Sequence, residues 1–120
     1  MDAQKRETLC AAGIDVDAAL ERLMGSDALL ERFLKKFAAD ANYARLQAAF
    51  EQADRDGAIA ASHTLKGMCG NLSMTALFDL FTRQVALLRA DDWSAAAALI
   101  PDIAQGYERA VQAIGMCFGS

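Results

Sequence analysis

One stretch sets the pattern for the whole chain: Ser62-His63-Thr64-Leu65-Lys66-Gly67-Met68-Cys69-Gly70-Asn71-Leu72. Apolar residues recur within it at intervals of three and four, the spacing of an amphipathic helix. These residues are Leu65, Met68, Cys69 and Leu72. At about 100° per residue, a different stripe of the same helix carries His63, Lys66, Gly67 and Gly70. We therefore expect His63, the only histidine of the chain, to face away from the buried side of this helix.

The two glycines of this helix, Gly67 and Gly70, need an explanation. Each costs about 0.5–1 kcal/mol relative to alanine in a helix interior, and departures of this kind are expected at functional sites. Without side chains, they would leave a shallow notch beside His63, and Lys66 would add a positive charge there. A nucleophilic nitrogen, a neighbouring cation and a cleared approach suit a phosphoryl group.

The segment His63-Thr64-Leu65-Lys66-Gly67, followed by small residues and Asn71-Leu72, resembles the signature of histidine-containing phosphotransfer (HPt) domains of multistep two-component signalling. The resemblance covers about residues 13–114, because Gly13 to Leu20, Phe33 to Phe37 and Ala90 to Trp93 resemble the flanking segments of such domains. The family commonly has a glycine one position after the Asn-Leu pair. This chain has Ser73 instead, a departure that concerns local turn geometry more than chemistry.

The resemblance implies a mechanism and a set of site residues. His63 would accept a phosphoryl group on Nε2 from a receiver-domain aspartate and pass it to another receiver aspartate, while Lys66 would offset the charge of the phosphate. The residues expected to dock the partner are Ile59, Gly67, Gly70 and Asn71. The expected partners are response-regulator receiver domains and a hybrid sensor histidine kinase. Mg²⁺ would be held by the receiver, so we expect no cofactor and no metal site in this chain.

Ile59 lies one turn before His63 on the same side of the predicted helix. A single apolar residue on a surface is ordinary and needs no function. Its position beside His63 nevertheless favours a part in a docking surface.

Composition limits the class of protein. The 120 residues are enough for one core, more than half of them are apolar, and only one is proline, which favours helix over sheet. A net charge of −4 argues against nucleic-acid binding. No apolar run is long enough to span a membrane, and the N-terminal residues do not resemble a secretory signal.

The three cysteines, Cys10, Cys69 and Cys117, are widely separated and odd in number. This spacing favours neither a disulfide framework nor a zinc site. A reducing cytoplasm is the simplest compartment for such a chain. A monomer is the simplest assembly, because the one conspicuous surface feature is small and suits a transient partner.

The helical pattern predicts an all-α fold, an antiparallel four-helix bundle with short N-terminal helices. We expect one HPt-like domain over residues 1–120, with a bundle core at about 27–114. The predicted bundle helices are 27–53, 57–72, 75–89 and 93–114. Two short helices, 2–11 and 16–24, would cover one end and finish at Gly13 and Gly25.

Local signals place several helix ends. Suitable N-cap residues are Asp15, Ser26, Asp56 and Asp92, and Asp56 would begin the His63 helix. Segment 27–53 is either one continuous helix or kinked near Asp40 to Asn42. Pro101 predicts a kink near Leu99 and Ile100, or two helices in succession. Residues 116–120 are expected to form a loose tail.

Other function classes fit less well. The chain lacks a glycine-rich ATP-binding loop, so we expect a phosphotransfer protein without kinase activity of its own. The main alternative is a helical interaction module that binds receiver or kinase domains without being phosphorylated, and the Ser73 departure favours it slightly. A hydrolase would need an oriented base and nucleophile, and a metalloprotein would need more histidine or cysteine ligands.

Overall fold

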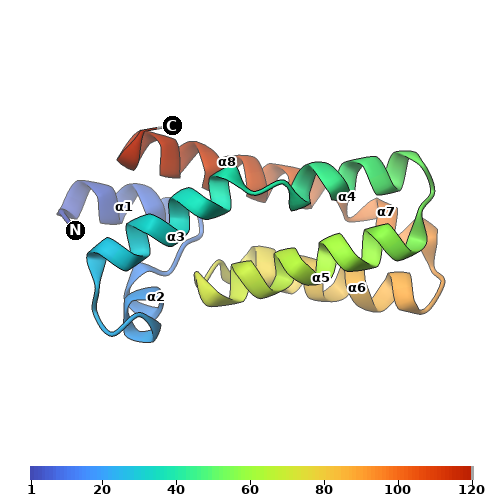
Figure 1. Ribbon diagram of the computed structural model, residues 1–120, viewed down its shortest axis with the longest axis horizontal. Helices are drawn as coiled ribbons and strands as arrows, with labels where there is room; N and C mark the ends of the chain where they lie inside the picture. The colour runs from blue at the N-terminus through green and yellow to red at the C-terminus, as the bar shows by residue number, and fades with distance from the viewer. Residues whose placement is uncertain (120) are drawn as a thin grey trace.

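The computed structural model describes residues 1–119, and Ser120 lies outside the described part. Eight helices and no strand occur in these residues (Figure 1). The helices are α1 (Ala3–Ala11), α2 (Val16–Arg22), α3 (Asp27–Ala39), α4 (Asn42–Glu51), α5 (Arg55–Asn71), α6 (Thr75–Arg89), α7 (Trp93–Ala98) and α8 (Ile100–Phe118). Within residues 1–119, no helix is both long enough and apolar enough to cross a membrane.

The helices form an elongated antiparallel bundle of 44 × 24 × 19 Å (Figure 1). Its four rods are α3 continued by α4, then α5, then α6, and finally α7 continued by α8. α5 packs most closely against α4 and α6, whereas α3 and α1 both pack against α8. The predicted all-α bundle with short N-terminal helices is confirmed.

A single apolar core joins all the helices. Phe37 of α3 and Phe81 of α6 are among its largest fully buried side chains, and Tyr107 of α8 stacks on Tyr43 of α4 with ring centroids 3.9 Å apart. Leu9 of α1 is also completely buried in this core. Since burying one large apolar side chain contributes about 1.5–3 kcal/mol, the N-terminal helices are part of the packing and do more than cover one end.

Three of the four predicted N-caps are confirmed. Asp15, Ser26 and Asp92 accept hydrogen bonds from the backbone N–H groups three residues later. The prediction for α5 was wrong, because Asp54 and not Asp56 caps this helix, accepting from the Gly57 N–H at 3.0 Å. Asp56 lies in the first turn, where its charge still favours the helix N-terminus.

Two interruptions divide the bundle rods. Asp40 is extended (ψ 143°), and its Oδ1 accepts hydrogen bonds from the backbone N–H and the side-chain amide of Asn42 at 2.7 and 2.8 Å. These bonds end α3 and begin α4, so segment 27–53 is two helices. Pro101 lies in the first turn of α8, where its missing N–H breaks no helical bond, which explains the two successive helices α7 and α8.

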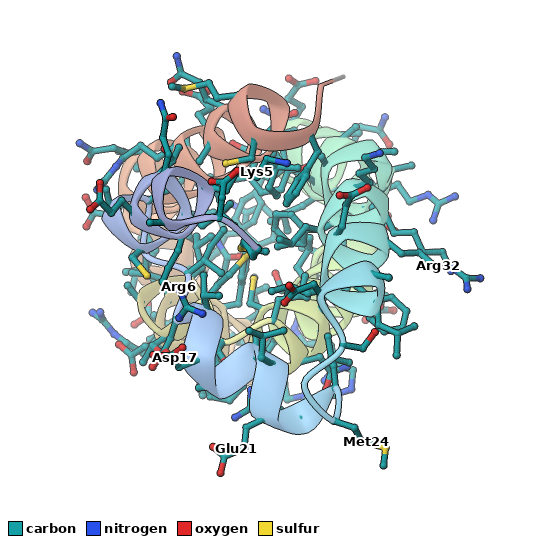
Figure 2. The ribbon with its side chains drawn as sticks, turned by 90° about the vertical axis from the view of Figure 1, so that its left-hand side faces the viewer. Lys5, Arg6, Asp17, Glu21, Met24 and Arg32 are labelled. Atoms are coloured by element: carbon teal, nitrogen blue, oxygen red, sulfur yellow. The ribbon has the colours of Figure 1, made fainter. Side chains whose placement is uncertain are left out.

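Two predicted ends differ from the structure. Both Met24 (φ 58°) and Gly25 (φ 76°) are left-handed after α2. Met24 takes the C′ position predicted for Gly25, because the Gly25 N–H bonds to the carbonyl of Leu20 at 2.8 Å, as the residue after C′ does in a Schellman motif. Figure 2 shows Met24 pointing into solvent at this end of the molecule. Residues 116–118 are not a loose tail but the last turn of α8, because the Phe118 ring packs under the Lys5 ammonium of α1, 5.3 Å from its centroid.

The same end-on view shows how the N-terminal helices hold together. In Figure 2, Arg6 of α1 points toward Asp17 of α2, and the two side chains form an ion pair. Arg109 of α8 donates a hydrogen bond to the carbonyl of Ala11 at 2.6 Å, at the end of α1. Polar contacts therefore connect α1 to both of its neighbours.

Candidate phosphotransfer site

α5 carries the residues of the predicted site and has two distinct faces. His63 is exposed near the middle of the helix. On the opposite face, Leu65 and Cys69 are at most 1% exposed. Of the four predicted buried residues, Leu65, Cys69 and Leu72 are buried, whereas Met68 is only half-buried. Ala58 and Ala61 are buried in the first half of the same helix.

Gly67 leaves open space beside His63. A Cβ atom placed on Gly67 would meet nothing within 4 Å outside its own helical backbone. Gly67 is four residues after His63, so it lies on nearly the same side of α5, one turn later. The structure therefore contains the open approach that the sequence predicted at this glycine.

Gly70 is different, and the prediction that it forms part of an open notch was wrong. A Cβ atom at Gly70 would lie 3.1 Å from Cδ1 and Cε1 of Phe78, an α6 side chain that is 38% exposed. The Gly70 carbonyl also accepts a hydrogen bond from Arg22 of α2. Gly70 therefore lets a neighbouring aromatic ring pack closely against α5.

The other predicted site residues lie around His63 at different depths. Lys66 is half-buried, and among the described residues its ammonium forms no ion pair. Ile59 is half-buried and packs against the core, so it is less exposed than predicted. Asn71 is exposed at the last residue of α5.

Asn71 also borders a groove of about 770 Å³ between α5 and the α2–α4 region. Its apolar wall includes Leu23, Phe33 and Leu72, and its cationic side chains are Arg22, Lys36 and Arg45. His63 does not line this groove. The exposed histidine and the groove are therefore separate features, with Asn71 bordering the groove at the end of the His63 helix.

Ser73 occupies the position where a glycine is most favoured. It follows α5 with φ 54°, in the left-handed region, and the N–H of Met74 bonds to the Cys69 carbonyl at 2.9 Å, as in a Schellman motif. Arg22 donates a hydrogen bond to Ser73 Oγ at 2.7 Å, and the Ser73 carbonyl accepts from the Asp15 N–H at 3.0 Å. These bonds offset the strain, so the usual turn is kept without glycine.

Two buried polar residues were missed in the sequence. Ser62 and Gln84 are both completely buried, and Ser62 Oγ donates a hydrogen bond to Gln84 Oε1 at 2.8 Å. Gln84 Nε2 then donates to the Ala96 carbonyl at 3.2 Å. Spacing could have revealed both, because Ser62 lies three residues before the buried Leu65 and Gln84 lies three after the buried Phe81.

The buried thiol below this site is not a competing nucleophile. Burial raises the pKa of Cys69 to about 12, so it remains a neutral thiol near neutral pH. Within residues 1–119 there is no group of three or more histidine, cysteine or acidic side chains placed to hold a metal ion.

The model of the Hpt domain family matches residues 28–113, more than two thirds of the chain. The chain belongs to this family. HPt domains are four-helix bundles that act as histidine phosphotransfer intermediates in phosphorelays, interact with receiver domains and are not kinases. The predicted family and class of function are thus confirmed. Comparison with curated proteins and with solved structures finds no match.

Proposed function

We propose that His63 is the residue of this HPt domain that carries the phosphoryl group. The observation that supports this assignment is that the only histidine of the chain is exposed on α5, beside the open space at Gly67. The domain then accepts a phosphoryl group from the aspartyl phosphate of one receiver domain and passes it to the aspartate of another.

The transfer is a displacement at phosphorus. The lone pair of Nε2 in the neutral imidazole attacks the phosphorus in line, while Nδ1 keeps its proton. As the P–N bond forms, the P–O bond to the aspartyl carbonyl group breaks, and the receiver aspartate leaves as a carboxylate. Passing the group to a second receiver reverses these steps.

Lys66 contributes positive charge during this reaction. It lies three residues after His63, on a neighbouring part of the outer face, and forms no ion pair in residues 1–119. Its ammonium offsets the negative charge of the phosphoryl group during transfer and in the phosphohistidine. The receiver supplies Mg²⁺, and the HPt domain supplies no cofactor.

The receiver docks on the outer face of α5. Gly67 gives its active-site loops access to His63, and Asn71 offers an amide at the end of the helix. Gly70 contributes through the half-exposed ring of Phe78 that packs on it. Ile59 contributes the part of its side chain that the core leaves accessible.

The proposed setting is a cytoplasmic relay. A hybrid sensor histidine kinase is the donor, receiver domains of response regulators are the acceptors, and the protein acts as a monomer. The three cysteines, Cys10, Cys69 and Cys117, are all free thiols, which supports a reducing compartment.

The test is phosphoryl transfer from a radiolabelled phosphorylated receiver to wild type and to His63→Gln. We expect an acid-labile, base-stable label on wild type and no label on the variant. Equal circular-dichroism melting curves would show that the variant is folded. An equally labelled His63→Gln would refute the assignment. Receiver binding without any label on wild type would favour an interaction module that is not phosphorylated.

A further inference from the structure

The hydroxyl of Ser62 is directed differently from the hydroxyls of three threonines within the helices. Thr8, Thr64 and Thr82 each donate a hydrogen bond to the carbonyl four residues earlier in their own helix. Ser62 directly precedes His63, and its Oγ donates instead to Gln84 on α6. A contact between helices, and not the local helix, therefore sets the direction of this side chain.

Gln84 extends the contact to a third helix. Its Oε1 accepts from Ser62 at 2.8 Å, and its Nε2 donates to the Ala96 carbonyl of α7 at 3.2 Å. Both side chains have no exposed surface. In the described residues, no buried side-chain nitrogen or oxygen lacks a hydrogen-bond partner, so this chain of bonds from α5 to α7 is complete.

Stability alone does not explain such a network. Burying polar groups is unfavourable unless they are hydrogen-bonded, and replacing a whole bonded set by apolar groups of similar shape can be nearly neutral. A completely bonded network nevertheless favours one arrangement of its helices, because other arrangements leave polar groups unpaired. The gain expected from Ser62 and Gln84 is therefore a defined geometry.

The network lies at the position on α5 where geometry matters most. Arg55 ties the start of α5 to α6 through the Leu88 carbonyl at 3.0 Å, and the Gly70–Phe78 contact joins the two helices near the other end. Ser62 makes the contact next to His63. A rotation of α5 that moved Ser62 away from Gln84 would turn the adjacent His63 by the same angle.

We propose that Ser62 and Gln84 are positioning residues for phosphotransfer. Their hydrogen bonds hold α5 at the rotation that presents His63 Nε2 to the receiver's phosphoryl group. The inference rests on the proposed role of His63. Reacting atoms must be held about 3–3.5 Å apart and aligned, and a misplacement of about 1 Å can reduce a rate about a hundredfold.

The variant that tests this role is the double substitution Ser62→Ala with Gln84→Leu. It removes both partners together, so neither side chain is left as an unpaired polar group. The Ala96 carbonyl still accepts from the Leu99 N–H at 3.3 Å. The control is Val85→Ala, which lowers packing at a buried neighbour of Gln84 without removing any of these hydrogen bonds.

Rapid-quench transfer from a phosphorylated receiver, measured over a range of receiver concentrations, separates docking from positioning. For the double variant we expect a limiting rate at least tenfold below wild type, an unchanged half-saturating concentration and an unchanged melting temperature. Val85→Ala should melt at a lower temperature and keep the wild-type limiting rate. A double variant with the wild-type limiting rate would overturn the proposal.

A second measurement does not depend on transfer. Because His63 is the only histidine, its imidazole Cε1–H gives one NMR signal. In the double variant we expect this signal and the backbone amides of residues 59–67 to shift, broaden or double, and in Val85→Ala to remain as in wild type. Unchanged signals in the double variant would refute positioning. Absence of label on wild type would instead contradict the role of His63, and the NMR comparison would still decide the geometry.

Discussion

The two faces of α5 are built on opposite principles. On the outer face His63 is exposed and the Gly67 position is open to solvent. On the inner face Leu65 and Cys69 are fully packed. The contrast shows that one face of a helix can carry the reactive residue while the opposite face packs into the core. Substitutions on the outer face should change phosphotransfer, and substitutions on the inner face should change the free energy of unfolding.

Gly70 marks the boundary between these faces. It has the same residue type as Gly67 and was predicted to have the same role, yet Phe78 of α6 covers it. One glycine leaves room for a partner, and the other leaves room for the protein's own aromatic ring.

Apart from the loss of His63 itself, the largest effect is expected on the outer face, from Gly67→Leu. A leucine at this open position would obstruct the receiver's approach to His63, and we expect the transfer rate to fall about a hundredfold. The fold should be kept or slightly stabilised, since leucine is the better helix former. Transfer kinetics and thermal melting measure the two effects.

Gly115→Leu is the matched control, because Gly115 on α8 also has no atom within 4 Å of a Cβ position. It should gain the same helical preference and transfer at the wild-type rate. Wild-type transfer by Gly67→Leu would break the contrast between the two faces.

A smaller effect is expected for Lys66→Gln. Loss of its charge should lower the transfer rate about tenfold, which corresponds to about 1.4 kcal/mol in the activation barrier. Melting should not change. Lys35→Gln on α3 removes an equal charge from an exposed pair with Glu31, and it should leave transfer unaffected. Equal transfer rates for the two variants would argue that Lys66 is only a solvated surface charge.

The inner face can be tested through Cys69. Because burial raises its pKa to about 12, the unfolded state loses this proton first as the pH rises above about 8.5. The free energy of unfolding should therefore fall with rising pH, with Cys69 contributing a loss of about 2.5 kcal/mol between pH 8 and pH 10.5. Urea unfolding at pH 8 and pH 10.5 would measure it.

Cys69→Ala should flatten this pH dependence while leaving transfer at pH 8 unchanged. Burial also raises the pKa values of Tyr43 and Tyr107, but both tyrosines are present in wild type and variant, so the difference isolates the thiol. An unchanged slope in Cys69→Ala would contradict the buried, neutral thiol.

The smallest predicted difference is in the free energy of unfolding, between alanine substitutions at Gly67 and at Gly70. Gly67→Ala should raise the free energy of unfolding by about 0.5–1 kcal/mol, because alanine is the better helix former and its Cβ meets no atom. Gly70→Ala should gain less, because its Cβ must displace the Phe78 ring. Chemical denaturation of the two variants compares them, and equal gains would mean that the ring moves freely.

Local sequence signals were sufficient for most of the fold. The spacing of apolar residues predicted the bundle helices, and Asp15, Ser26 and Asp92 marked helix starts correctly. At the start of α5, Asp56 was predicted as the cap, and the cap is Asp54, two residues earlier. The choice depended on the left-handed turn at Ala53 (φ 51°), which ends α4 early.

The site was less predictable because its surroundings come from distant parts of the chain. The environment of Gly70 depends on Phe78 and Arg22, which lie on other helices. Ser62 and Gln84 are polar, so each looks like a surface residue until its partner is known. Each lies at helical spacing from a buried apolar residue, and this spacing was the one available signal that it is buried. In the sequence analysis, more weight was given to the polar residue type.

The hydrogen bonds from Arg22 to the end of α5 limit how far the N-terminus of this domain can be truncated. α5 has no basic residue in its last turn, and the cation that reaches its Gly70 carbonyl comes from α2, which precedes the family match at residues 28–113. The backbone bond from Asp15 to Ser73 crosses the same boundary. A fragment trimmed to residues 28–113 would therefore lose the contacts from Arg22 and Asp15 that support the end of α5.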